Sequence, residues 1–89
     1  MPFLTDETAD QLRRQGYAVL PDVFGTGNII VQAALISTVY PGHERPGERP
    51  KTTMDIGAPI GASTGINTSA TVEQVADELL RVASLRSTV

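Results

Sequence analysis

The sequence contains no cysteine and no tryptophan, and only two tyrosines and two phenylalanines among its 89 residues. Without cysteine the chain can form no disulfide framework and no thiolate metal site. The net charge of −3 is spread over interspersed acidic and basic residues, whereas a nucleic-acid-binding surface needs clustered lysine and arginine. We therefore expect no thiolate-bound metal and no nucleic-acid partner.

Long apolar runs are also lacking. The longest, Ile29 to Tyr40, is far shorter than the ~20 residues that a membrane-spanning helix needs. The N-terminal residues MPFLTDET carry acids where a secretory signal would carry basic residues and then an apolar core. We expect a soluble chain without a membrane partner, located in the cytoplasm or within a virion. Its length corresponds to a single small domain, residues 1–89.

The run from Ile29 to Tyr40, IIVQAALISTVY, is the stretch around which the rest is organised. Its two ends are rich in β-branched and aromatic residues, which favour strands. Read with a period of two, both faces are largely apolar, which is typical of a strand covered on both sides. The alternative is a buried helix that begins after Asn28, with Ala33 and Ala34 as good helix formers. Periodicity does not separate the two for so short a run, and the β-branched ends favour the strand.

Two helices flank this run. Residues Leu4 to Gln15 have Thr5 as an N-cap and are followed by Gly16, a typical C-terminal stop. Residues Thr71 to Leu85 begin with the capping-box pattern of Thr and Gln three residues apart. The apolar stripe of this second helix is expected to pack on the sheet, with the remaining residues in solvent. The stripe comprises Val72, Val75, Ala76, Leu79, Leu80 and Ala83, and the predicted solvent face Glu73, Asp77, Glu78 and Arg81.

On the solvent face, Asp77 and Arg81 have the spacing of an ion pair. Arg13 and Arg14, at the end of the first helix, are expected to be solvated. Short strands are predicted at Tyr17–Leu20 and at Thr52–Ile56, the latter antiparallel to the central run.

The predicted fold class is therefore α+β: a small antiparallel or mixed sheet with an N-terminal and a C-terminal helix and long glycine- and proline-rich loops. Residues 41–51, PGHERPGERPK, are expected to form an exposed charged loop. Residues 57–70, GAPIGASTGINTSA, are expected to form a glycine-rich loop, or an arm that lies on a neighbour through Ile60 and Ile66.

The residues QGYAVLPDVF, from Gln15 to Phe24, resemble the opening of phytanoyl-CoA dioxygenase-like enzymes, in which a helix runs into a similar segment. That family binds iron through an HxD pair and a distant second histidine. Here the single histidine, His43, is followed by Glu44 and Arg45, so the HxD pair and the second histidine are both absent. The resemblance therefore implies no activity, and we interpret it as shared helix-to-strand chemistry.

No catalytic, cofactor-binding or metal-binding motif is evident. The turn Gly25-Thr26-Gly27-Asn28 lacks the third glycine of a dinucleotide fingerprint and the Gly-Lys of a P-loop. His43 with Glu44 and Glu48 lies on one predicted loop, whereas metal sites need several ligands on rigid elements. We predict no cofactor and no enzymatic activity. An enzyme that uses His43 with a serine or threonine of the glycine-rich segment is the least favoured hypothesis.

The two helices offer too little apolar surface to cover a sheet that is apolar on both sides. This excess of apolar surface predicts a protein interface, because burial of each exposed apolar side chain would stabilise the protein by ~1.5–3 kcal/mol. We expect a non-enzymatic structural or assembly subunit of a homo-oligomer or larger complex, with a virion or phage particle as one setting. The alternative is a small binding or regulatory module that docks on one larger protein. The predicted interface residues are Ile30, Ile36, Tyr40, Ile60 and Ile66.

Overall fold

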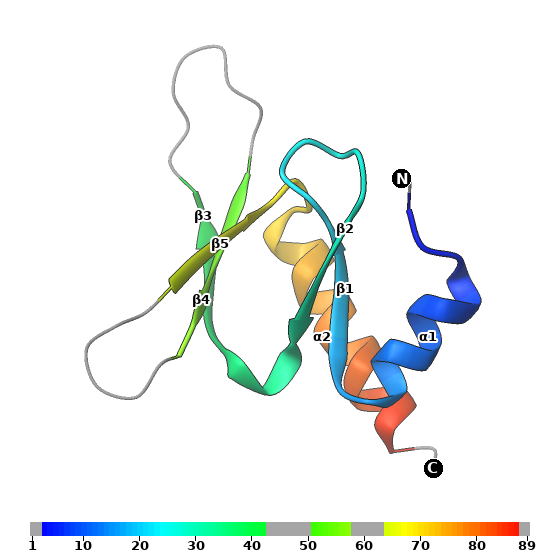
Figure 1. The fold of residues 1–89 in the computed structure, drawn as a ribbon. Helices are drawn as coiled ribbons and strands as arrows, with labels where there is room; N and C mark the ends of the chain where they lie inside the picture. The colour runs from blue at the N-terminus through cyan, green and yellow to red at the C-terminus, as the bar shows by residue number, and fades with distance from the viewer. Residues whose placement is uncertain (1–2, 43–50, 58–63, 88–89) are drawn as a thin grey trace.

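A computed structural model describes residues 3–42, 51–57 and 64–87 of the chain. These residues form two helices and two antiparallel sheets, which confirms the predicted α+β class. Figure 1 shows a two-stranded hairpin between a three-stranded sheet and the N-terminal helix. The elements are, in chain order, α1 (Asp6–Arg14), β1 (Tyr17–Pro21), β2 (Asn28–Gln32), the 3-10 helix η1 (Ala33–Leu35), β3 (Ile36–Pro41), β4 (Thr52–Ile56), β5 (Thr64–Thr68) and α2 (Val72–Arg86).

Both helices begin where the sequence predicts. The Thr5 side chain accepts a hydrogen bond from the Thr8 N–H (3.2 Å) at the start of α1. At the start of α2, Thr71 accepts from the Gln74 N–H and the Gln74 side chain accepts from the Thr71 N–H, so the capping box is complete. Gly16 follows α1 with φ = 98°, a backbone conformation that suits glycine because a Cβ atom would be strained there. These local signals therefore fix the ends of both helices.

The central run is not one strand, so that prediction was wrong in its extent. The run is divided between β2 in the hairpin and β3 in the other sheet, and η1 joins them. The alternative, a buried helix that begins after Asn28, is not observed either, because η1 is a 3-10 helix of three residues, none of them buried. This division explains why both faces of the run look apolar. Val31 in β2 and Val39 in β3 both point to the core. In one continuous strand Leu35 would lie on the same face as these two valines, but it is exposed in η1.

The hairpin pairs β1 with β2 in the register Val19 opposite Ile30, and its loop spans residues 22–27. The carboxylate of Asp22 fixes this loop by accepting hydrogen bonds from the Phe24 N–H (3.0 Å), the Thr26 N–H (2.9 Å) and the Thr26 hydroxyl (3.0 Å). Gly25 supplies the positive φ that the turn requires, 71°. In the second sheet β4 lies between β3 and β5, and β4 is antiparallel to β3, as predicted.

The glycine-rich segment 57–70, predicted to be a loop or arm, contains the strand β5. Its sequence alternates, so that Ile66 lies opposite Met54 on the inner face and the exposed Gly65 and Asn67 lie on the outer face. The Thr68 hydroxyl donates to the Pro21 carbonyl oxygen and so joins β5 to the hairpin. In the charged segment 41–51, Pro41 ends β3 and the Gly42 N–H donates to the Lys51 carbonyl oxygen (2.9 Å), while residues 43–50 lie outside the described residues.

The core lies where the inner faces of the hairpin and the three-stranded sheet meet α2. Its buried residues come from all three layers, and α1 packs against β1 and α2. The buried cluster consists of Leu20, Val31, Met54, Ala70 and Val75, with Ile29, Ile36, Val39, Ile56, Ile66 and Leu79 packed around it. Neither α1 nor α2 has the length and apolar character needed to cross a bilayer, which is the result for the part of the chain that the structure describes.

Candidate functional site

The outer edge of β2 is the candidate site, and its geometry follows from the hairpin ladder. In an antiparallel pair, hydrogen-bonded and non-hydrogen-bonded residue pairs alternate. The Asp22 N–H donates to the Gly27 oxygen (3.0 Å) and the Ala33 N–H donates to the Gly16 oxygen (2.9 Å), which sets the alternation at both ends. The backbone groups of Ile29 and Val31 therefore point to β1. Those of Asn28, Ile30 and Gln32 point away from it, and we call these three residues the β2 edge.

The other edge of the hairpin is closed. The Val19 N–H, which points away from β2, donates to Glu78 Oε2 on α2 (2.8 Å). Pro21 has no N–H, and its carbonyl oxygen accepts from the Thr68 hydroxyl. No such partner reaches the outward backbone groups of Asn28 and Ile30 from any residue that the structure describes, whereas the Gln32 carbonyl oxygen accepts the first hydrogen bond of η1, from the Leu35 N–H. Among the described residues, the β1 edge is therefore closed at Val19 and Pro21, and the β2 edge is open at Asn28 and Ile30.

The side chain of Ile30 is 49% exposed, although that of Val19, directly opposite, is only 7% exposed. Both lie on the face of the hairpin that points away from the core. The helix α1 packs over β1 and covers Val19, but its narrow apolar strip leaves the β2 half of this face open. The segment before α1 is attached near the start of β2, since the Leu4 N–H donates to Asn28 Oδ1 (2.7 Å). The Ile30 side chain is thus left half-exposed by the described residues.

The other predicted interface residues do not join Ile30 in one patch. Ile36 and Ile66 are half-buried and pack against the core cluster. Tyr40 is 40% exposed, but it lies on the outer face of the three-stranded sheet, on the far side of the core from Ile30. Ile60 lies outside the described residues. Of the predicted set, Ile30 alone combines an exposed apolar side chain with outward backbone groups that lack partners among the described residues.

The outer face around Tyr40 is polar. The Tyr40 hydroxyl donates to Asp55 Oδ1 (3.3 Å), and the Thr53 hydroxyl donates to Asn67 Oδ1 (2.9 Å). Partial desolvation and, after it, the charge and hydrogen bond of Asp55 raise the pKa of Tyr40 above its ordinary value of 10.0. Because these side chains are hydrogen-bonded to one another, this face offers a partner fewer free donors and acceptors than the β2 edge does.

A buried ion pair that the sequence argument missed lies behind the hairpin. Arg13 and Glu78, both expected in solvent, are each only 8% exposed, and Arg13 Nε donates to Glu78 Oε2 (2.8 Å). Arg13 Nη1 also donates to Asp10 Oδ1 (2.7 Å). The hydrogen bond to Glu78 outweighs the cost of burial and raises the pKa of Arg13. A sequence signal existed, because Glu78 lies three residues after Val75 and four before Val82, the two buried valines of α2.

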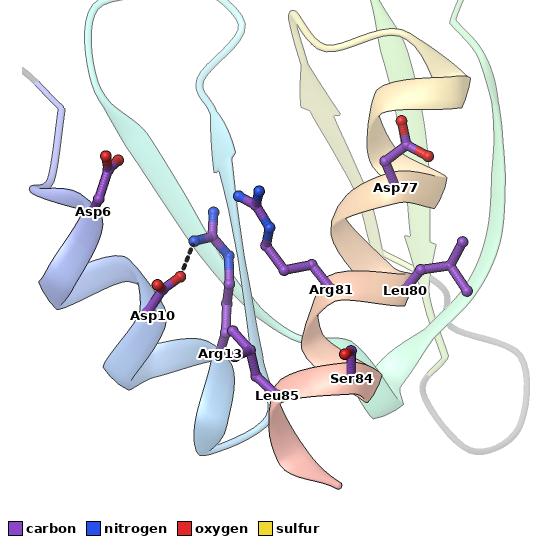
Figure 2. A pocket seen from close by; sticks show the side chains of 8 residues that line it. All are labelled: Asp6, Asp10, Arg13, Asp77, Leu80, Arg81, Ser84 and Leu85. Carbon is purple, nitrogen blue, oxygen red and sulfur yellow. Dashed lines mark hydrogen bonds and ion pairs between the residues drawn. The ribbon is translucent and has the colours of Figure 1, made fainter. Parts of the chain in front are cut away.

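Because Glu78 is on the buried face of α2, some apolar residues of the predicted stripe lie on its exposed face. Leu80 is 69% exposed and lies at the rim of a groove between α1 and α2 that has a volume of about 630 Å³. In Figure 2 its side chain points away from α1. The predicted ion pair between Asp77 and Arg81 is not formed. The groove is lined by Asp6, Asp10, Arg13, Asp77, Leu80, Arg81, Ser84 and Leu85.

The groove offers no assembled catalytic group. No histidine lies beside Ser84 among the described residues, and the chain's one histidine, His43, lies outside them. Arg13 is held by Asp10 and Glu78 in ion pairs that stabilise the fold. Within residues 3–42, 51–57 and 64–87, no three histidine, aspartate or glutamate side chains converge as metal ligands would.

Comparisons with protein-family models, with curated proteins and with solved structures found no match for this chain.

Proposed function

We propose that the protein is a non-enzymatic structural or assembly subunit that works as a homo-oligomer or within a larger complex. The observation that supports this is the β2 edge, where a strand with outward donors and acceptors carries the half-exposed Ile30. Strand edges of this kind readily pair with another chain. This proposal includes the cytoplasm or a virion or phage particle as the setting.

The absence of protection on the β2 edge strengthens the proposal. Monomeric proteins block edge strands with lysine, proline or a bulge, or cover them with another element. The sequence of β2, NIIVQ, contains no charge and no proline, and its register with β1 is regular over all five pairs. The β1 edge, in contrast, is covered by α2 and ends in Pro21. One edge of the hairpin is thus closed by the fold and the other is left able to accept a strand.

A second candidate, a small binding module that docks on one larger protein, is favoured by the groove between α1 and α2. Leu80 provides an exposed apolar contact at its rim, and the two aspartates that are not in an ion pair, Asp6 and Asp77, outnumber the arginine that is not in one, Arg81. This surface suits a segment with one apolar and several basic side chains. We rank it second because the groove is open and presents no unpaired backbone groups. An enzyme using His43 ranks third.

Light scattering coupled to size-exclusion chromatography tests the proposal. We expect a molar mass that rises with concentration above the 9.5 kDa of one chain. L80D, which alters the groove and leaves the β2 edge intact, serves as a control and should associate like the wild type. A well-folded chain that remains a monomer at micromolar to millimolar concentrations would contradict the proposal. If that monomer also forms a stable one-to-one complex with a larger protein, the second candidate gains support.

A further inference from the structure

We propose that a second copy of this chain pairs with the β2 edge, antiparallel and centred on Ile30, to make a continuous four-stranded sheet. This inference rests on the proposed function and specifies its contact. The search for other docking edges narrows the choice. The β1 edge is closed by Glu78 and Thr68. Just after β5 the Ser69 N–H donates to the Asp22 carbonyl oxygen (3.3 Å), and β3 ends in Pro41, which has no N–H.

The β2 edge is complementary to itself. A two-fold axis through Ile30, perpendicular to the sheet, places Ile30 opposite Ile30 of the partner subunit and Asn28 opposite Gln32 of the partner subunit. Because the backbone groups of residues 28, 30 and 32 point outward, the 30–30 and 28–32 pairs take the hydrogen-bonded positions of the new ladder and alternate with the non-hydrogen-bonded pairs of residues 29 and 31. The Gln32 carbonyl oxygen accepts from the Leu35 N–H of η1 and has a second lone pair for this ladder. A shift of one residue would place inward groups opposite outward ones. A shift of two residues would leave one end of each strand unpaired.

The side chains agree with the same register. Antiparallel pairing about this axis keeps corresponding faces on one side, so the two Ile30 side chains meet on the face that α1 leaves open. The residues at either end are the neutral amides Asn28 and Gln32, so that no like charges oppose each other. In the resulting sheet, ordered β1–β2–β2–β1, each α1 covers an outer strand. The half-exposed Ile30 becomes the centre of the contact, covered by its own counterpart.

Single cysteines test the register directly, because the natural chain has none. In I30C the two cysteines face each other across a hydrogen-bonded pair with Cα atoms about 5.5 Å apart, within the range that a disulfide spans. In Q32C, the matched control on the same strand, the two cysteines lie about 14 Å apart, since four residues separate them along the ladder. We expect a disulfide-linked dimer of I30C on mild oxidation and little from Q32C.

A mixture adds a positive control for the register. N28C and Q32C should each cross-link poorly alone and efficiently when mixed, because residue 28 opposes residue 32 of the partner subunit. Equal cross-linking of I30C and Q32C, or none of I30C, would overturn the pairing. If the wild type nevertheless associates by light scattering, the proposed function stands with another contact. If neither the wild type nor any variant associates, the proposed function and the proposed pairing are both wrong.

A charge variant checks the pairing without cysteine chemistry. I30K places two like charges against each other at the axis and should raise the dissociation constant of the dimer at least ~10-fold. E73K, on the exposed side of α2, adds the same side chain away from the edge and should leave it unchanged. Circular dichroism confirms that each variant is folded before comparison. An unchanged dissociation constant for folded I30K would overturn the pairing.

Discussion

Replacement of Glu78 by alanine should lower the free energy of unfolding of this small domain far more than the same replacement at an exposed position of a helix would. Glu78 Oε2 accepts hydrogen bonds from Arg13 Nε and from the Val19 N–H, both at 2.8 Å, so one carboxylate oxygen joins α1, β1 and α2. The side chains of Arg13 and Glu78 are 10% and 8% exposed. E78A therefore leaves a nearly buried guanidinium with a single carboxylate, Asp10, and leaves the outward N–H of β1 without an acceptor.

Breaking a buried ion pair by removing one partner costs ~3–5 kcal/mol, because the remaining charge stays buried. Asp10 still bonds Arg13 and is itself 42% exposed, so the expected loss lies at the lower end, about 3 kcal/mol. E78Q can keep both hydrogen bonds without the charge, and should cost about half as much. With a urea m-value of ~1–1.5 kcal/mol/M, the loss in E78A lowers the unfolding midpoint by ~2–3 M.

Urea unfolding followed by circular dichroism measures this loss, with all variants at one protein concentration because association also stabilises the fold. D77A is the matched control, since Asp77 is the exposed neighbour of Glu78 on α2 and makes no ion pair in the described structure; it should change stability by less than ~0.5 kcal/mol. R13A/E78A should cost less than the sum of the single variants. A loss in E78A as small as that in D77A would refute the buried-pair account.

Hydrogen bonds from Thr26 and Phe24 hold the pKa of Asp22 below its ordinary value of 3.8, so its contribution to stability is present above about pH 4 and is lost as the pH falls through the folded-state pKa. D22N should have a lower urea unfolding midpoint than the wild type at neutral pH, and its midpoint should fall less steeply below pH 4. An equally steep fall of the two midpoints below pH 4 would contradict this. Because Asp55 contributes to the raised pKa of Tyr40, D55N in a Y17F background should move the tyrosine absorbance titration to lower pH, and an unmoved titration would contradict the contact. T71A removes the acceptor of the Gln74 N–H and should cost ~0.5–2 kcal/mol in thermal or urea unfolding, whereas a neutral effect would mean that the capping box does not stabilise α2.

The parts of the fold that local chemistry decides could be predicted. The N-caps of both helices, the stop at Gly16 and the positive φ of Gly25 follow from the conformational preferences of single residues. The α+β class follows from the alternation of helix-period and strand-period segments. These features depend on neighbours in sequence, which is why the sequence contains enough information to place them.

The features that depend on distant contacts could not be predicted. The break of the central run at Ala33 depends on which sheet each half joins, and periodicity does not contain that information. The burial of Arg13 depends on Glu78, 65 residues away. For Ile30, the sequence indicated excess apolar surface but not where it lies. The open edge beside Ile30 appears only when the ladder with β1 is known.

The central claim is that the β2 edge pairs with a second copy, and amide hydrogen exchange measured by NMR over a concentration series tests it most directly. Ile29 and Val31 bond to β1 within one chain, so their amides should be protected at every concentration. The outward amide of Ile30 should exchange rapidly in dilute protein and become protected as the concentration rises. An Ile30 amide that exchanges equally fast across the whole series would contradict the claim.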